Sequence, residues 1–273
     1  MVYEVVVGHT AFPGGYRKYQ CTGVDDQKVI ADALREVSLA QGEGRLIIRR
    51  GTYAIRGPID ASLVNVRLVL EGENLRTILQ FQDQRSGLRF ANGPNGIEVK
   101  QLTLQGIRPA LQPPTPTALE NLLIDNCADC LVEDCIIETA FNMGCVVRFS
   151  PRAKIARCQF IDNGQEGSVF FENIGGTMTQ CVSRLNRLDG FNFGTSAFAI
   201  PLDCSIVGCW SDQDGNGIIE LGDPVDPPFN IGASGIFTTR PGLTIVGCVI
   251  TRATATGIAV EGQDEAPLSQ AEH

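Results

Sequence analysis

The sequence predicts an all-β solenoid, a single-stranded right-handed parallel β-helix of about seven to eight coils with a short N-terminal capping helix. The first observation behind this prediction is a cysteine that recurs in a unit of about 23 residues, and the second is a glycine eight or nine residues after each cysteine. The third is the alternation of apolar residues within each unit. The cysteines are Cys135, Cys158, Cys181, Cys209 and Cys248, and the glycines are Gly144, Gly167, Gly190, Gly217 and Gly257.

Short strands fill each unit. Val132, Ile155 and Met178 lie three residues before their cysteines, and Ile137 and Phe160 lie two residues after theirs. No unit contains a run long enough for a helix, which excludes ankyrin, tetratricopeptide and HEAT arrays, and the leucine-rich consensus is missing. We therefore expect each coil to bury its inward residues against the coils above and below, at a spacing of about 4.8 Å.

The recurring cysteines are interpreted as a column of small buried apolar groups, because cysteine is among the most buried residue types. Disulfides between neighbouring positions are the alternative if the protein is exported. Cys127 and Cys130 form a CxxC pair, but no second pair accompanies it, and the two histidines, His9 and His273, are not suitably spaced for zinc. We expect no metal site and no cofactor.

An amphipathic helix is predicted over about residues 25–40, with Asp25 and Asp26 capping its start and Gly42 and Gly44 ending it. Its apolar face comprises Val29, Ile30, Ala33, Leu34 and Val37. Such a helix covers the first coil of a solenoid, whose core would otherwise be open.

Four motifs around and after this helix resemble the N-terminal part of the pectate-lyase-like (pectin-lyase-fold) β-helix superfamily. They are YQCTGVDDQ (19–27), GTY (51–53), LEG (70–72) and RTIL (76–79). The pattern is similar to that of phage tailspikes and depolymerases, and with the repeats it covers about residues 16–262. The resemblance implies the fold but leaves the activity open, because the superfamily includes lyases, hydrolases, epimerases and inert appendages.

Three segments are expected: an N-terminal cap with the first strands over 1–64, the parallel β-helix over 65–262, and a frayed polar tail over 263–273. Two insertions interrupt the period. Residues 107–117 carry four prolines and residues 221–242 combine acidic and aromatic side chains, so both are expected to project from the rod and to form a groove or a subunit contact.

Charge limits the partners. The net charge is −9 and only four of the 273 residues are lysines, so nucleic acid and anionic membranes are not expected, whereas a polysaccharide is. The start of the chain lacks the basic and apolar regions of a signal peptide, and no run is long enough to span a membrane. We expect cytoplasmic synthesis, with virion association or external release as the route out.

Carboxylates provide the candidate chemistry. The residue before each ladder glycine follows a turn and begins a strand, which places Glu166 and Asp189 at equivalent positions on neighbouring coils, with Asp214 on the next. Their backbones should lie about 5 Å apart, so repulsion would separate their pKa values into an acid and a base. Two carboxylates on adjacent coils would have the separation found in retaining glycosidases, and two carboxylates that are two coils apart would have the separation found in inverting ones. The alternative is that these three acids are ordinary solvent-exposed residues of turns.

The text NRLDGF (186–191) resembles the Asn-Thr-Asp-Gly-Phe element of polygalacturonase-like members, which implies a catalytic role for Asp189. The paired-aspartate and Gly-His-Gly elements of that family are absent, so polygalacturonase activity itself is not expected. The full set of residues before the glycine positions is Ser86, Glu120, Met143, Glu166, Asp189, Asn216 and Thr256.

Substrate-binding candidates accompany the acids. Arg148 and Arg187 could bind a sugar carboxylate or sulfate, and Arg184 with Arg187 would be the lyase candidates. Phe229, in the second insertion, is a candidate for stacking on sugar rings. Asn163 and Asn186 are expected to form a structural asparagine ladder.

Two functions remain open at this stage. The first is a carbohydrate-active enzyme, more readily a glycoside hydrolase than a lyase or epimerase. The second is a non-catalytic virion or tail appendage that binds a receptor. An exposed apolar stripe of Val146, Val169, Ile219 and Phe171 would indicate lateral homotrimer packing instead of a free substrate groove.

Overall fold

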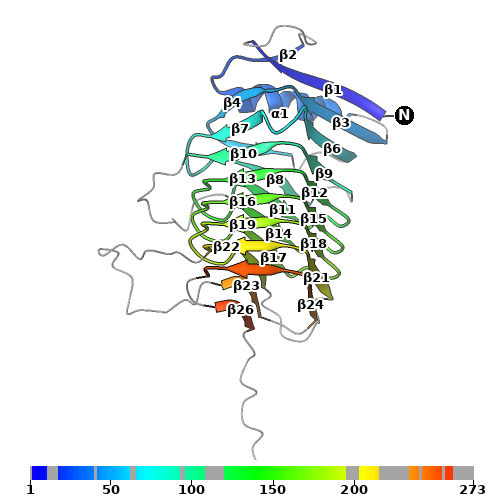
Figure 1. The fold of residues 1–273 in the computed structure, drawn as a ribbon. Coiled ribbons are helices and arrows are strands. Elements are labelled where there is room, and N and C mark those ends of the chain that lie inside the picture. Colours follow the sequence, from blue (N-terminus) through cyan, green and yellow to red (C-terminus); the bar gives the residue numbers. More distant parts are fainter. Residues whose placement is uncertain are drawn as a thin grey trace, which may run out of the picture.

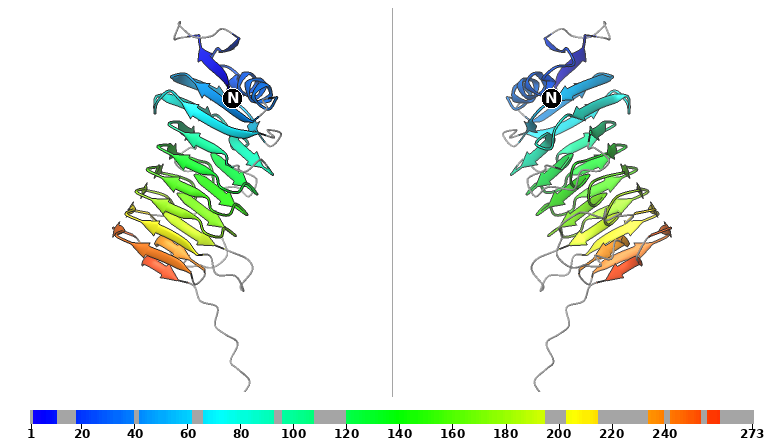
Figure 2. Two further views of the ribbon diagram at one scale, coloured as in Figure 1. Left: turned by 90° about the vertical axis from the view of Figure 1, so that its right-hand side faces the viewer. Right: turned by 90° about the vertical axis from the view of Figure 1, so that its left-hand side faces the viewer.

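The computed structural model describes residues 2–10, 18–39, 42–61, 66–92, 96–107, 120–194, 203–214, 234–239, 242–253 and 256–260. These residues form one helix and three parallel β-sheets wound into a rod (Figure 1). The two side views show the sheets stacked along the rod, with the helix at the N-terminal end (Figure 2). The described helix is too short to cross a membrane.

Each coil contributes one strand to each sheet, and we call the sheets A, B and C in the order in which the chain visits them. Sheet A contains β1 (Val2–His9), β2 (Tyr19–Cys21), β3 (Glu43–Ile48), β6 (Arg67–Gly72), β9 (Glu98–Lys100), β12 (Leu131–Glu133), β15 (Lys154–Ala156), β18 (Thr177–Thr179), β21 (Cys204–Val207) and β24 (Leu243–Val246). Sheet B contains β4 (Gly51–Ile55), β7 (Thr77–Phe81), β10 (Thr103–Gly106), β13 (Ile136–Glu138), β16 (Gln159–Ile161), β19 (Val182–Arg184), β22 (Trp210–Asp212) and β25 (Val249–Thr251). Sheet C contains β5 (Pro58–Asp60), β8 (Gly87–Ala91), β11 (Leu122–Asp125), β14 (Cys145–Arg148), β17 (Ser168–Phe171), β20 (Phe191–Gly194), β23 (Ser234–Thr238) and β26 (Thr256–Val260).

Strands pair in register with their equivalents one coil away. Ile137, for example, lies between Leu104 of the preceding coil and Phe160 of the following one, and all three are fully buried. Sheets B and C each hold eight strands, so the described residues make eight coils. The predicted parallel β-helix is confirmed, and its first coil, β3 to β5, lies within the segment predicted as cap and first strands.

A single left-handed residue makes the corner between sheets A and B. Asp134, Arg157 and Gln180 have φ angles of 53°, 52° and 53°, and each is followed directly by a ladder cysteine. One residue in this region reverses the usual side-chain alternation and bends the chain sharply, which is why three-residue strands can turn without a loop. The cysteine after the corner points into the core.

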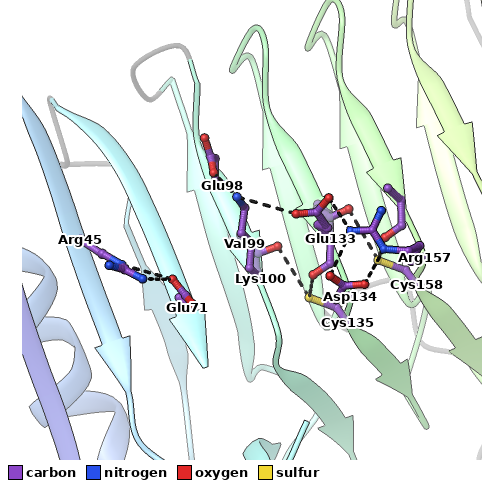
Figure 3. A network of polar contacts seen from close by, with 12 residues as sticks. Arg45, Glu71, Glu98, Val99, Lys100, Glu133, Asp134, Cys135, Arg157 and Cys158 are labelled. Atoms are coloured by element: carbon purple, nitrogen blue, oxygen red, sulfur yellow. Dashed lines mark hydrogen bonds and ion pairs between the residues drawn. The ribbon is translucent and has the colours of Figure 1, made fainter. Parts of the chain in front are cut away.

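The cysteine ladder is packed as predicted. None of the ten cysteines forms a disulfide, and nine of them are buried, with Cys248 half-buried. The thiols of Cys135 and Cys158 donate to main-chain oxygens in their own coil and in the preceding one, as Figure 3 shows for these two coils. The ladder is therefore a structural column that needs no disulfide.

The corner between sheets B and C contains the predicted asparagine ladder. Asn163 donates its side-chain amide to Asn186 Oδ1 at 2.8 Å, and Asn186 in turn donates to Asp214 Oδ1 at 2.8 Å. The ladder explains the recurring glycine, because a Cβ on Gly167 would lie 2.8 Å from Asn186 Nδ2. Only glycine leaves room for the stacked amides.

The glycine register departs from the prediction after Gly190. Phe191 pairs with Ile236, so Gly235 and not Gly217 stacks on Gly190, and Ser234 takes the place predicted for Asn216. Gly217 and Asn216 lie outside the described residues. The prediction was wrong because it counted the first residues of the insertion as part of the repeat.

The N-terminal cap consists of α1 (Asp26–Val37) and the two added strands of sheet A, β1 and β2. The predicted role of Asp26 is corrected: its buried carboxylate does not cap its own helix but accepts hydrogen bonds from the backbone N–H groups of Thr22, Gly23 and Ala54. It thereby ties the helix start to β4 and seals the first coil.

On the outer face of sheet A, Glu71, Lys100 and Glu133 stack on successive coils and alternate in sign (Figure 3). Arg45 pairs with Glu71 at 2.6 Å, Lys100 pairs with Glu98 at 2.6 Å, and Arg157 reaches Glu133 at 2.6 Å. Each exposed pair contributes little to stability, but together they neutralise the cations on this face. Sheet A is therefore not a basic surface.

We predict that a thiol reagent will modify at most one cysteine, Cys248, in the native protein, because the other nine thiols are buried. All ten should react after unfolding in denaturant. Counting modified thiols by mass spectrometry tests this, and rapid reaction of several thiols in the native protein would contradict the packed ladder.

We also predict that Asn186→Ala will lower the free energy of unfolding by about 3 kcal/mol, because it leaves buried partners on both neighbouring coils unsatisfied. Denaturant unfolding measures the change. Asn74→Ala is the matched control: the exposed Asn74 side chain accepts one hydrogen bond from the Arg76 N–H, so its loss should cost about 1 kcal/mol or less. Equal effects of the two changes would sink the ladder interpretation.

Candidate functional site

Sheet C offers an outer face unlike that of sheet A. Its inward positions are apolar, as in Cys145 and Val147, and the alternate positions of the same strand, Val146 and Arg148, face outward. Stacking these outward positions over several coils brings together an apolar stripe and a few polar groups. The acidic candidates lie at the start of these strands.

Glu166 is the residue on which the site depends. It lies in the turn before β17, its side chain is only 9% exposed, and its Oε2 atom has no hydrogen-bond partner. Burial raises the pKa of Glu166 to about 7, and the nearby charge of Asp189 adds to the rise. A carboxylic acid with this pKa holds its proton near neutral pH and can donate it.

Asp189 occupies the equivalent turn one coil further along, and the N–H of Gly167, next to Glu166, donates to the Asp189 carbonyl at 3.0 Å. The Asp189 carboxylate accepts from the Ser234 N–H at 2.7 Å and from the Asn192 side-chain amide at 3.2 Å. Donors of this kind stabilise negative charge. Both acids are buried, but one oxygen of Glu166 has no partner whereas both oxygens of Asp189 accept N–H groups.

Two arginines and a third acid extend this column toward the N-terminus. Glu120 stands two coils before Glu166; burial raises its pKa, while Arg148 and Arg89 act in the opposite direction. Arg148 also donates to Asp125 at 2.8 Å, and the Nε atoms of Arg89 and Arg148 are buried without a partner. These two cations face the same surface as the acids.

Arg89 and Asn192 were not among the sequence candidates. Both lie at the outward position two residues after the glycine position, where Leu123, Val146 and Val169 stand on the intervening coils. The signal that could have found them is this register position. A polar residue there interrupts an otherwise apolar stripe.

Asp214 is placed differently from the other two acids. It is fully buried at the end of the asparagine ladder, where Oδ1 accepts from Asn186 and Oδ2 accepts from Ser211 at 2.7 Å. Burial raises the pKa of Asp214 to about 6 against these hydrogen bonds. Asp214 lies five residues after Cys209, just as Asn163 lies five residues after Cys158. This spacing could have identified Asp214 as a member of the ladder.

The arginine candidates are distributed over two sheets. Arg148 lies at the end of β14 on the outer face of sheet C, whereas Arg184 is exposed on β19 of sheet B and Arg187 lies in the turn between these sheets. Arg148 is therefore on the face of the acids, and Arg184 is not. Phe229 lies outside the described residues, as do residues 108–117 of the first predicted insertion and residues 221–233, 240 and 241 of the second.

The predicted apolar stripe is covered. Val146 and Val169 are 6% and 7% exposed, and they pack with Leu123, Met143 and Phe171 into a small cluster. Ile219 lies outside the described residues. The condition set for lateral homotrimer packing, an exposed stripe, is thus not met at Val146 and Val169.

A second polar cluster lies at the cap, beside a cavity of about 370 Å³ that Tyr3, Lys18, Tyr19 and Glu36 help to line. Lys18 and the hydroxyls of Tyr19 and Tyr3 all donate to Glu36, which lowers the pKa of this carboxyl to about 2. The Glu36 carboxylate, which accepts from three donors, therefore links α1 to β1 and β2. Across the described part of the chain, no group of three or more His, Cys, Asp and Glu side chains could hold a metal ion.

Comparison with known proteins supports the fold. No family model and no curated protein matches the chain. The catalytic unit of the thermostable GH87 α-1,3-glucanase from Streptomyces thermodiastaticus is 16% identical with a TM-score of 0.58, over 92% of this chain and 42% of that one. The ORF18 protein of Geobacillus virus E2 is 14% identical with a TM-score of 0.56, over 89% and 48%.

The structure of pectate lyase Pel9A is 14% identical with a TM-score of 0.55, over 87% of this chain and 62% of that one. The chain thus spans 42%, 48% and 62% of the lengths of these three structures. At these identities the likeness shows the fold alone. The chain has a right-handed parallel β-helix fold, as these structures do.

We predict that Asp214→Asn will stabilise the protein at neutral pH. The pKa of Asp214 is raised from 3.8 to about 6 by folding, so stability present below about pH 4 is lost as the pH rises through 6. An asparagine can still accept from Asn186 and carries no charge. The expected gain is up to about 3 kcal/mol at about pH 7.5, and close to zero at about pH 3.5.

Denaturant unfolding at the two pH values measures this gain. A variant that is less stable than the parent protein at neutral pH would assign the ionised Asp214 an essential role in the ladder.

Proposed function

We propose that this chain is a carbohydrate-active β-helix protein that cleaves a polysaccharide with Glu166 and Asp189 on the face of sheet C, as a glycoside hydrolase. The observation that carries the proposal is the pair itself: a buried glutamic acid whose pKa is about 7, one coil away from an aspartate held by N–H donors. The solved α-1,3-glucanase and pectate lyase of the same fold act on polysaccharides by their names.

In the proposed reaction Glu166 is the general acid that protonates the leaving glycosidic oxygen. Its proton is available near neutral pH because burial opposes its ionised form. The Asp189 carboxylate, which accepts N–H groups from Ser234 and Asn192, bonds to the anomeric carbon as the glycosidic bond breaks, and a water molecule deprotonated by Glu166 then releases the sugar. Strands one coil apart are separated by about 4.8 Å, which is close to the separation of about 5 to 5.5 Å in retaining glycosidases, so we propose retention of configuration.

The same surface suggests how a sugar chain is held. Arg148 and Arg89 supply positive charge beside Glu120, and they suit an acidic sugar substituent. The small apolar cluster of Leu123, Val146 and Val169 lies in register between Arg89 and Asn192 and keeps these cations apart from the reacting pair. Arg187 and Phe229 are proposed as further sugar contacts at the edges of this surface. We assign Asp214 a structural role in the asparagine ladder, because it is fully buried.

The alternative is a non-catalytic virion or tail appendage that uses this face to bind a receptor. The likeness to a protein of Geobacillus virus E2 favours this alternative, and virion association or external release would then give the protein its location. A tailspike-like homotrimer would fit this alternative, whereas depolymerase activity would fit the hydrolase. Cleavage assays separate the two functions.

We predict that the purified chain releases reducing ends from at least one polysaccharide in a panel of neutral and acidic glycans, without unsaturated products. Glu166→Gln and Asp189→Asn should each lower kcat/KM by about 1000-fold, because each removes one group of the acid–base pair. Reducing-end assays and ultraviolet absorbance follow the two product types.

Glu138→Gln is the matched control, a glutamate of sheet B that accepts a hydrogen bond from Gln105 at 2.7 Å. It should retain full activity. Unsaturated products would contradict the hydrolase proposal and direct attention to Arg184 and Arg187, and cleavage of no glycan would favour the appendage.

The pH dependence is a separate prediction. Because Glu166 must be protonated to act and its pKa is about 7, kcat/KM should fall about tenfold per unit as the pH rises above 7. A pH–rate profile of the free enzyme measures this limb. A profile that stays flat to about pH 9 would remove Glu166 from the role of general acid.

A further inference from the structure

A phenylalanine is exposed at a left-handed corner between sheets C and A. Phe149 directly follows β14, has a φ angle of 50° and is 49% exposed. Bulky residues rarely adopt a positive φ, because the Cβ atom then approaches the backbone carbonyl oxygen. An exposed ring also adds nothing to the core. The folding of this coil therefore gives no reason for a phenylalanine at this position.

The same corner is polar on three neighbouring coils. Asn92, Asn126, Phe149 and Glu172 form one column, in which each N–H group donates to a carbonyl oxygen of the next coil and each φ angle lies between 50° and 53°. Asn126 donates its side-chain amide to Asn92 Oδ1 at 2.8 Å. Asparagine is among the residues that tolerate this conformation best. Phe149 therefore stands where the corner favours a polar residue, and backbone strain of this kind is concentrated at ligand sites.

A second aromatic ring fixes one side of Phe149. Phe171 lies at the end of β17, the strand that neighbours β14 in sheet C (Figure 1). The two rings meet edge to face, with centroids 6.1 Å apart and planes at 89°. Phe171 is half-buried, because it packs against the cluster that contains Val146 and Val169. We call this pair of one anchored and one exposed ring the aromatic platform.

A glycine connects the aromatic platform to the acid pair. Gly194 pairs in register with Phe171, and a Cβ atom on it would lie 3.5 Å from the Phe171 ring and 3.3 Å from Asn192 Oδ1. Because glycine has no side chain, the ring and the Asn192 amide line the same space. Asn192 also donates to Asp189 Oδ2 at 3.2 Å. The platform is therefore continuous, through Asn192, with the carboxylate proposed to attack the sugar.

A pair of opposite charges borders the aromatic platform. Arg148 precedes Phe149 and stacks in register on Phe171, and its guanidinium group donates to Asp125 at 2.8 Å. Both side chains of this ion pair are partly exposed. They offer donors and acceptors side by side with no net charge. An apolar ring with such a rim suits a ligand that has an apolar face and hydroxyl groups around its edge, as a pyranose ring does.

The exposed aromatic area is too small for a protein partner. An aromatic side chain buries about 150–250 Å² when it is covered, so the exposed half of Phe149 offers about 100 Å². A stable protein–protein interface takes about 800 Å² from each partner. The size of the platform therefore favours a single ring of a small or chain-like ligand.

We propose that the aromatic platform is a sugar-binding subsite, on which the apolar face of one pyranose ring of a polysaccharide stacks while its hydroxyl groups bond Arg148 and Asp125. Because the ligand is a polysaccharide, this subsite rests on the proposed carbohydrate-active function. Five residues of extended chain lead from Glu166 to Phe171, a distance of about 16 Å. The stacked ring is therefore several sugar units away from the bond that is cleaved, and Phe149 selects for long chains without taking part in the acid–base step.

Binding to the full chain with Glu166→Gln tests the subsite without cleavage. Affinity electrophoresis in gels that contain amylose, dextran, xylan, alginate or hyaluronate identifies the glycan, and calorimetry with oligosaccharides of graded length from that glycan measures dissociation constants. Phe149→Ala in this background should weaken binding of the long chains about tenfold or more, because about 100 Å² of apolar area is no longer buried. Oligosaccharides too short to reach from the acid pair to the platform should bind equally well to both proteins.

Three further variants separate a binding role from a structural one. Phe149→Tyr keeps the ring and should bind long chains within about threefold of the parent. Leu75→Ala is the matched control, because Leu75 is a similarly exposed apolar residue in the turn between β6 and β7, and it should bind like the parent.

Phe149→Asn suits the left-handed corner and can extend the hydrogen bond between Asn92 and Asn126 by one coil. It should raise the midpoint of thermal unfolding by about 3 °C while binding long chains as weakly as Phe149→Ala. A lower midpoint than that of the parent would show that Phe149 serves the fold and would overturn the proposal.

The outcomes distinguish the subsite from the hydrolase. Binding that depends on Phe149 in a chain that cleaves no glycan supports the subsite and contradicts the hydrolase. Cleavage by the parent chain, with unchanged binding in Phe149→Ala, supports the hydrolase and overturns the subsite. A chain that binds none of the polysaccharides, or a Phe149→Ala effect that is equal for short and long oligosaccharides, also overturns the subsite.

Discussion

The in-register stacking of each residue on its equivalent one coil away is the constraint on which the structure depends. It places cysteine above cysteine and asparagine above asparagine, at a spacing of about 4.8 Å. The left-handed corner residue and the glycine that leaves room for the ladder both recur because the stack repeats. A substitution in one coil therefore alters the packing of the coils above and below it.

Stacking also decides where charge is stable. On sheet A, Lys100 stacks between Glu71 and Glu133 of the neighbouring coils, so that the charges alternate in sign over these three coils. At the start of the sheet C strands, Glu166 and Asp189 break this rule, since two acids occupy successive positions and one of them has a buried oxygen without a partner. A purely structural surface would avoid two acids at successive positions, whereas acid–base catalysis requires such a pair.

The two ends of the rod face the same problem of an open core and meet it differently. At the N-terminal end, α1 covers the first coil and the Asp26 carboxylate binds N–H groups from three segments. At the C-terminal end, the described residues present valines, a tryptophan and three strand edges. A solenoid built from repeating units needs a distinct solution at each end.

The fold and the ladders could be predicted from the sequence alone, because a fixed period specifies which residues stack. The cysteine column, the pairing of Asn163 with Asn186, and the common position of Glu166 and Asp189 follow from spacing. Prediction failed where the insertion before β23 breaks the period, which moved the glycine position from Gly217 to Gly235. Counting from the cysteine, not from the glycine, would have placed Asp214 in the asparagine ladder.

Tertiary structure alone decided burial and the unsatisfied groups. Equivalent turn positions hold Glu166 and Asp189, yet one oxygen of Glu166 is left without a partner while Asp189 receives an N–H from Ser234, 45 residues later in the chain. The covered stripe around Val146 and the exposed face around Trp210 have similar apolar sequences. Periodicity specifies which residues are neighbours, but the solvent exposure and pKa of a side chain depend on all the atoms that surround it.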